Sequence, residues 1–295
     1  MPEAVSLLYQ FGTNAAFLLL SALGLIVILG MMNIINLAHG EFMMLGAYAA
    51  TASVQRGVPF PLAVLIAAVA VGLFGVVIER LIVRRFYGRE LGALVVTWGI
   101  SLILGQGALL LFGPFMPPIA IPGGAVSLGD YSFSVYWLFL IVLCGVLLAA
   151  LGFVYRATRF GLQARAAMQN ARMARALGIR VDRIYMATFG LGAALAGLSG
   201  ALLAPTTSIA PFMGQQFVAP AFITVVVGGG ASVIGGALGS SGLLSLVQTP
   251  IAFLFGTFSG TLALLLTALV VIRLLPGGVS SVGRYFTRRS LAAAR

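Results

Sequence analysis

A short polar segment near the N-terminus concentrates the side chains that could bind or pass a solute. Residues 33–41 place Asn33, Asn36, His39 and Glu41 between two apolar runs. Ionisable groups inside a membrane are costly and usually face a bundle interior, a partner or a water-filled path. The segment therefore predicts a path or gate. The alternative is that Asn36 and Glu41 cap a helix and that His39 is a hinge residue.

Two hydroxyl groups further along the chain form a second candidate site. Thr97 and Ser101 are four residues apart, so in a helix they share one face with Gly105. Such hydroxyls can face a solute path. They can also hydrogen-bond a neighbouring helix or their own backbone without any substrate, and both interpretations remain open.

A glycine triplet forms a third candidate site. Gly228, Gly229 and Gly230 follow the short apolar segment 217–228 and precede another apolar run. Interrupted helices in corresponding positions of two halves often flank a transport site. We therefore pair this triplet, as a hypothesis, with the break at His39.

Residues 161–178 predict a short helix outside the apolar spans. Arg165, Gln169 and Arg172 line one face, and Gly178 is placed to end the helix. Small side chains form the opposite face: Ala164, Ala167, Ala171 and Ala174. A flat alanine face suits docking into a groove on another protein. The alternative is an interfacial helix held to anionic lipid by its arginines.

The elements that must position these residues are membrane spans. Hydrophobic residues make up 61% of the chain and charged residues 8%, against about 25% charged in soluble domains. The apolar runs are continuous rather than alternating, which favours helices over barrel strands. We predict an all-α polytopic membrane bundle of about eight or nine spans, some interrupted or re-entrant, in a single domain over residues 1–295. The candidate segments are 13–32, 40–54, 61–83, 92–112, 135–155, 185–204, 217–228, 233–251 and 257–272.

The charges orient these spans. Nearly all of the arginines fall in three clusters, over residues 79–90, 155–183 and 273–295, whereas the alternate loops are nearly uncharged. Cytoplasmic loops carry the excess of basic residues. We therefore expect a periplasmic N-terminus and a cytoplasmic C-terminus, which requires an odd number of crossings. Whether segment 217–228 crosses or re-enters stays open.

The composition excludes several kinds of chemistry. The chain has no lysine, so it holds neither a phosphate-binding P-loop nor a Schiff-base lysine, and any ATP must be hydrolysed by another chain. With one cysteine (Cys144) and one histidine, it forms neither a disulfide nor a Cys/His metal cluster. The arginines lie beside apolar spans without interleaved aromatic residues, which favours lipid headgroups over nucleic acid. We expect no cofactor and no enzymatic activity.

Four stretches resemble the permease subunits of high-affinity branched-chain amino acid ABC importers. They cover residues 33–48, 97–104, 158–179 and 228–236, in the order expected for the first of the two permeases that such importers pair. Urea and short-amide permeases share these motifs, so import of urea or amides is an alternative. A gradient-driven transporter or channel is a further alternative, although only Glu41 is placed for ion coupling.

The resemblance implies a bacterial inner-membrane protein with several partners. These are a second homologous permease, two cytoplasmic ATP-binding subunits, a periplasmic solute-binding protein and the surrounding lipid. It also implies that residues 155–184 form a cytoplasmic coupling loop that seats on the ATP-binding subunits. The residues expected to carry this coupling are Arg165, Ala167, Gln169, Asn170, Arg172, Ala174 and Gly178.

Overall fold

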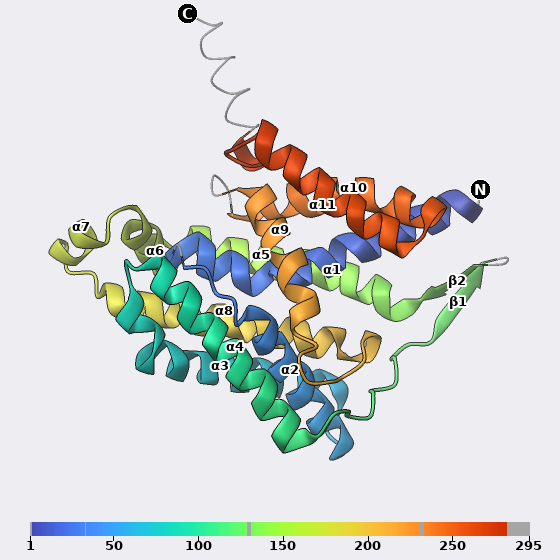
Figure 1. Ribbon diagram of the computed structural model, residues 1–295, viewed down its shortest axis with the longest axis horizontal. Coiled ribbons are helices and arrows are strands. Elements are labelled where there is room, and N and C mark those ends of the chain that lie inside the picture. The colour runs from blue at the N-terminus through green and yellow to red at the C-terminus, as the bar shows by residue number, and fades with distance from the viewer. Residues whose placement is uncertain (1, 33, 129–130, 230–232, 282–295) are drawn as a thin grey trace, which may run out of the picture. The chain divides into compact units, whose positions relative to one another are not determined.

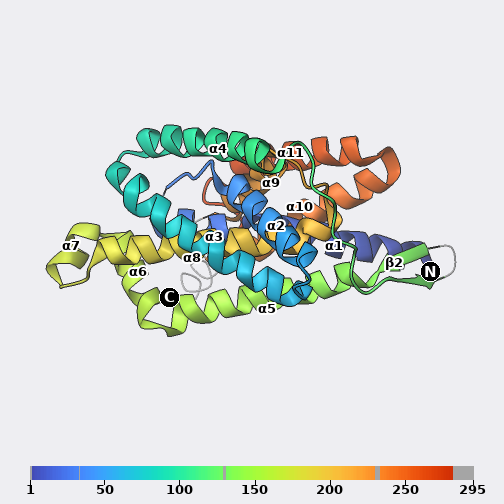
Figure 2. The same ribbon diagram turned by 90° about the horizontal axis from the view of Figure 1, so that it is seen from below.

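The computed structural model describes residues 2–32, 34–128, 131–229 and 233–281 (Figures 1 and 2). Its α-helices are α1 (Pro2–Met32), α2 (His39–Gln55), α3 (Phe60–Leu81), α4 (Glu90–Phe112), α5 (Val135–Ala157), α6 (Arg159–Gln169), α7 (Ala171–Ala176), α8 (Val181–Leu203), α9 (Gln215–Gly228), α10 (Val233–Phe255) and α11 (Thr257–Leu274). The remaining elements are the 3-10 helices η1 (Val83–Phe86) and η2 (Ala204–Thr206) and the strands β1 (Ala125–Leu128) and β2 (Tyr131–Ser134). The predicted all-α fold class is confirmed.

The count of long spans is slightly lower than the sequence predicts. Seven helices in the described part of the chain are long and apolar enough to cross a membrane: α1, α3, α4, α5, α8, α10 and α11. The two remaining candidates are α2, with 17 residues, and α9, with 14 residues. Both are shorter than the roughly 20 residues that a straight crossing needs. The sequence predicted that segment 217–228 is short, whereas it predicted a span for segment 40–54.

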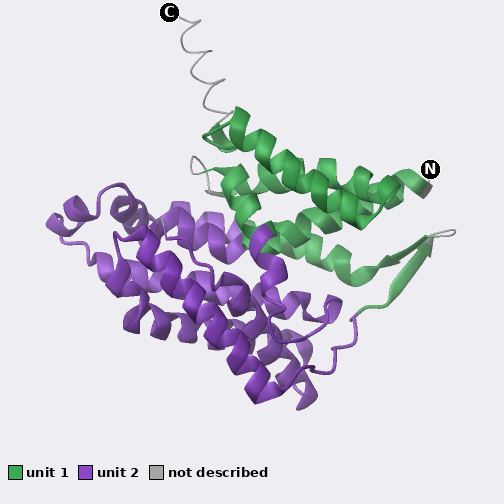
Figure 3. Cartoon of the chain, viewed as in Figure 1, with its two compact units in different colours: residues 1–22, 123–148, 220–295 green, residues 23–122, 149–219 purple. Residues whose placement is uncertain are grey.

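The chain divides into two compact units (Figure 3). The first unit comprises residues 1–22, 123–148 and 220–295, and the second comprises residues 23–122 and 149–219. The second unit contains the polar segment before α2, the hydroxyl groups of α4 and the α6 and α7 helices. The first unit contains the glycine triplet.

Small residues on α8 determine how the second unit packs. This helix contacts both α2 and α3. A Cβ atom at Gly200 would overlap the Met43 carbonyl of α2, and one at Gly192 would overlap the Ile28 side chain of α1. Small side chains spaced by four residues let membrane helices approach this closely. Gly192 and Gly200 thus let α8 lie against α1 and α2.

The first unit is built on the α10–α11 pair and an apolar cluster that includes Leu18, Val227 and Leu244. Its β1–β2 hairpin is antiparallel and is held to α1 through one side chain. The Tyr9 hydroxyl donates to the Ser134 carbonyl at 3.2 Å and accepts from the Ser134 N–H at 3.0 Å. The hairpin is thus attached to a long helix.

Candidate functional site

A buried, non-helical break separates α1 from α2. Asn33 lies outside the described residues, and residues 34–38 are not helical. The Asn36 Oδ1 atom accepts from the Ala38 N–H at 3.1 Å, which turns the chain into α2. The Asn36 side chain is fully buried, and within the described residues its Nδ2 atom has no hydrogen-bond partner. A buried donor without a partner is costly, so this amide stays a candidate for binding a solute.

Thr97 holds the non-helical segment in place. Its Oγ1 atom accepts from the Leu37 N–H at 3.1 Å and lies 3.0 Å from the Leu94 carbonyl, to which it donates. Thr97, Ser101 and Gly105 are all buried on one face of α4. The shared face predicted for them is confirmed, and the Thr97 hydroxyl reaches across to another segment as well as to its own helix.

We expect Thr97→Val to destabilise the break. The substitution preserves the side-chain shape but removes the acceptor for the Leu37 N–H, and an unpaired backbone donor costs about 1–3 kcal/mol. The unfolding temperature of the purified chain in detergent should therefore fall. Thr97→Ser keeps the oxygen and should stay close to the unsubstituted protein. Equal losses in the two variants would contradict this role for the hydroxyl.

Glu41 places a carboxylate in the first turn of α2. The residue is fully buried. The positive end of the helix dipole favours a negative group here. Ser101 of α4 lies near this carboxylate, and within the described part of the chain neither Glu41 oxygen has a hydrogen-bond partner. The two Glu41 oxygens could therefore accept hydrogen bonds that the described residues do not supply.

The two short helices α2 and α9 begin next to each other. A Cβ atom at Gly40, in the first turn of α2, would overlap the Gly214 carbonyl, and α9 begins at Gln215. His39 is fully buried, and its ring lies against Gly24 of α1. The sequence-based pairing did not identify Gly214 as the residue that meets this break. The available signal was its position in an uncharged stretch before a short apolar helix.

Gly228 and Gly229 make close-packed contacts within the first unit. Gly230 lies outside the described residues. A Cβ atom at Gly228 would meet the Gly236 backbone, and one at Gly229 would overlap the backbone of Gly277 and Gly278. The glycines thus allow the end of α9 to touch the start of α10 and the turn that follows α11. The role of these glycines in a gate stays a prediction.

We expect Gly229→Ala to be strongly destabilising. Gly229 has a φ of 74°, and the left-handed conformation costs an L-residue about 1–2 kcal/mol. The overlap with Gly278 adds to that cost. Gly124→Ala is the control, because Gly124 has a φ of 65° but open space around it. Thermal unfolding should show a larger loss for Gly229→Ala, and equal losses would argue against the packing contribution.

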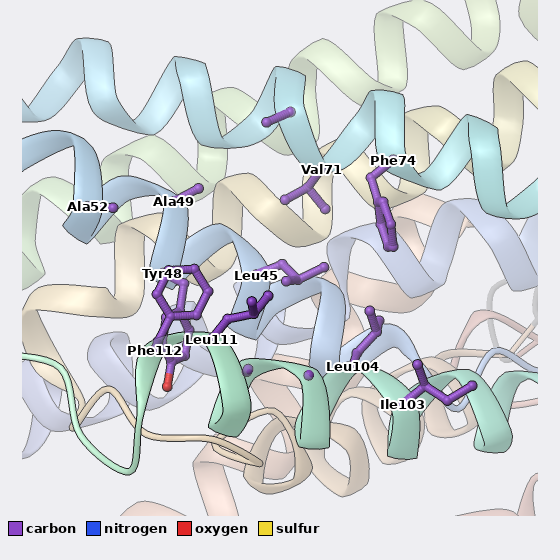
Figure 4. A pocket seen from close by; sticks show the side chains of 13 residues that line it. Leu45, Tyr48, Ala49, Ala52, Val71, Phe74, Ile103, Leu104, Leu111 and Phe112 are labelled. Atoms are coloured by element: carbon purple, nitrogen blue, oxygen red, sulfur yellow. The ribbon is translucent and has the colours of Figure 1, made fainter.

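A cavity of about 560 Å³ lies between α2, α3 and α4 (Figure 4). Its walls are almost wholly apolar and include Tyr48, Phe74 and Leu104. The polar candidates Glu41, Thr97 and Ser101 are not among the side chains that line it. The cavity can accept an apolar group, whereas the buried polar groups lie nearer the start of α2.

The predicted helix over residues 161–178 is two helices. Thr158 caps α6, because its Oγ1 atom accepts from the Gly161 N–H at 3.1 Å. Asn170 has an extended backbone, and its Oδ1 atom accepts from the Met173 N–H at 2.9 Å. An asparagine that caps a helix competes with continuing the previous one. Asn170 therefore ends α6 and starts α7.

The alanine face of these helices is buried within the chain itself. Ala164 packs in a cluster with Ile184, and Ala167 and Ala174 pack against Val181. Ala167 and Ala174 are only 1% and 2% exposed. The expectation that this face docks into another protein is wrong, because α8 already occupies it. If Ala167 and Ala174 contribute to the expected coupling with ATP-binding subunits, they do so by fixing α6 and α7 on α8.

The exposed face of α6 and α7 is mixed apolar and basic. Met173 is 58% exposed and Leu177 is 74% exposed. We define the α6–α7 surface as the exposed residues Met168, Gln169, Arg172, Met173 and Leu177. Exposed large apolar residues between arginines are typical of a protein contact. Sequence reasoning identified Gln169 and Arg172 and missed the three apolar residues.

Arg165 and Gly178 have local roles. The Arg165 guanidinium donates to the Tyr155 carbonyl and lies 5.0 Å from the centre of the Tyr155 ring. Gly178 has a φ of 84°, and the Ile179 N–H donates to the Ala174 carbonyl at 3.0 Å. These are the features of a Schellman motif, in which a glycine closes a helix. The prediction that Gly178 ends the helix is confirmed.

The fold and site define a multi-pass helical membrane protein in which two short helices begin against each other. Residues 7–275 match the family described as branched-chain amino acid transport system/permease component, and the chain belongs to this family. It is 30% identical to the high-affinity branched-chain amino acid transport system permease protein BraD of Pseudomonas aeruginosa, over 87% of this chain and 90% of that protein. It is 29% identical to the permease protein LivH of Escherichia coli K12, over 88% of this chain and 90% of that protein. No solved structure matches the chain.

Proposed function

We propose that the chain is the translocation subunit of an ATP-driven importer that carries branched-chain amino acids across the bacterial inner membrane. Family membership and the transport functions for which BraD and LivH are named support the substrate class. The absence of lysine supports separate ATP-binding subunits, because a P-loop needs one. A second permease and a periplasmic solute-binding protein complete the proposed complex.

The substrate path in this proposal passes the start of α2. The observation that carries it is the meeting of two short helices, α2 and α9, at Gly40 and Gly214. In many transporters, discontinuous helices place their polar ends beside the solute. Asn36, His39 and Glu41 lie at or near this break, and the α4 hydroxyls face it. The remaining members of the proposed path or gate are Asn33, Thr97, Ser101, Gly228, Gly229 and Gly230.

The α6–α7 surface is the proposed contact with the ATP-binding subunits. Its exposed apolar side chains would become buried when a partner binds, and Arg172 would complement the charge of an acidic groove on that partner. The conformation of this surface depends on the local contacts of Arg165, Asn170 and Gly178. Its two helices are held on α8 by Ala167 and Ala174. The arginine-rich loops lie in the cytoplasm, with the N-terminus outside.

Competition for uptake tests the substrate class. The complete complex, reconstituted in liposomes with its solute-binding protein, should take up labelled leucine when ATP is supplied. Unlabelled isoleucine and valine should compete, and urea and acetamide should not. Uptake of labelled urea that leucine does not inhibit would overturn the proposed substrate in favour of an amide importer.

A further inference from the structure

One acidic side chain joins three elements at the end of the second unit that carries α6 and α7. Asp182, in the first turn of α8, accepts from Arg84 of η1 with an Oδ2–Nη2 distance of 2.6 Å. Its other oxygen accepts from Arg175 of α7 with an Oδ1–Nη2 distance of 3.2 Å. Each carboxylate oxygen therefore holds one arginine. α7 and the α3–α4 connection are tied to the same residue.

Asp182 is the only acid among seven arginines in residues 155–183. The side chains of the two pairs are 43–55% exposed. Exposed ion pairs contribute little to stability because solvent screens them. The hydrogen bond to Asp182, together with the charge of that carboxylate, raises the pKa of Arg84. We therefore expect the cluster to determine where α7 lies rather than whether the chain folds.

A second set of contacts links the same connection to α6. The Tyr87 hydroxyl donates to the buried Glu79 carboxylate at the end of α3. The Tyr87 ring packs edge-on against Tyr185 of α8, with ring centres 5.0 Å apart. The Tyr185 hydroxyl lies 3.5 Å from the Ala167 carbonyl of α6, to which it donates. Both cytoplasmic helices are thus connected to residues 82–89.

These residues lead directly into α4. A Cβ atom at Gly92 would meet the Phe86 ring at 2.8 Å, so η1 lies close against the first turn of α4. The Ala93 N–H donates to the Arg89 carbonyl at 2.9 Å. Further along the same helix, Thr97 accepts from the Leu37 N–H. A continuous series of contacts therefore runs from α7 to the break before α2.

We propose that Asp182 is a positioning residue that couples α7 to η1 and α4, so that displacement of the α6–α7 surface reaches the start of α2. This inference rests on the proposed function, because the displacement is supplied by ATP-binding subunits. Coupling between sites is a free energy shared through a physical network, so removing one link should reduce it without abolishing folding.

Asp182→Asn tests the inference in the reconstituted complete complex. It removes the charge and preserves the shape. We expect ATP-driven leucine uptake to fall about five- to tenfold, with basal ATPase activity and the unfolding temperature close to the unsubstituted values. Arg183→Gln is the matched control, since Arg183 is the next residue, is exposed and forms no ion pair within the described residues. It should transport normally.

A double-mutant cycle separates positioning from a general charge effect. Arg84→Gln should reduce uptake on its own, and adding it to Asp182→Asn should cause little further loss, because Asp182→Asn already removes the ion pair with Arg84. Asp182→Glu should restore part of the uptake. Normal transport by Asp182→Asn, additive losses in the cycle, or an equal loss in Arg183→Gln would each overturn the inference. Absence of ATP-driven uptake in the unsubstituted complex would instead contradict the proposed function, and the inference would fail with it.

Discussion

Replacing Arg172 and Leu177 together by glutamate is expected to abolish ATP-driven uptake while the chain stays folded. Both side chains are exposed on the α6–α7 surface. The substitutions reverse a charge and place a second carboxylate where an apolar contact is expected. Like charges and an unpaired buried carboxylate at an interface cost several kcal/mol, so the ATP-binding subunits should no longer copurify with the permease.

Two comparisons determine what that result means. Arg156→Glu makes the same charge reversal at an exposed residue outside the α6–α7 surface, and it should leave copurification intact. Ala174→Glu should instead reduce the amount of folded chain, because Ala174 is 2% exposed against α8. Normal copurification by the Arg172→Glu, Leu177→Glu chain would contradict the assignment of this surface.

Gly200→Leu is expected to prevent α2 from packing on α8. A single added carbon at Gly200 would already overlap the Met43 carbonyl, and backbone cannot rotate away as a side chain can. Overpacking of this kind costs about 3 kcal/mol or more. The yield of folded chain in membranes should fall sharply, together with the unfolding temperature in detergent.

Gly99→Leu provides the control for that substitution. Gly99 lies in α4, and a Cβ atom there would meet nothing within 4 Å. Leucine should therefore be tolerated at position 99, and leucine has a better helix propensity than glycine. If Gly200→Leu folds as well as Gly99→Leu, the close approach of α2 and α8 is not required.

Much of the fold was predictable because lipid imposes simple rules. Continuous apolar runs must be helices, since every backbone group in a bilayer needs an internal partner. The spacing of Thr97, Ser101 and Gly105 is enough to place them on one helix face. Gly178 was identifiable because few other residues adopt the left-handed conformation that ends a helix.

The errors concern features that depend on tertiary contacts. Asn170 is compatible with a helix interior and with an N-cap, and only the fit of α6 and α7 on α8 decides between them. Alanine likewise suits an exposed docking face and a buried close contact, so the burial of Ala167 and Ala174 was not readable from spacing. The meeting of Gly40 with Gly214 joins residues far apart in the sequence, and no local pattern encodes it.

The most direct test of the central claim is whether uptake needs ATP hydrolysis by separate subunits. Liposomes holding the complete complex would be supplied with labelled leucine, the solute-binding protein, and either ATP or a non-hydrolysable ATP analogue. The account predicts accumulation above the external leucine concentration with ATP alone, and none with the analogue or without the ATP-binding subunits. Accumulation that continues with the analogue, driven by an ion gradient, would show that the chain works as a secondary transporter and would contradict the account.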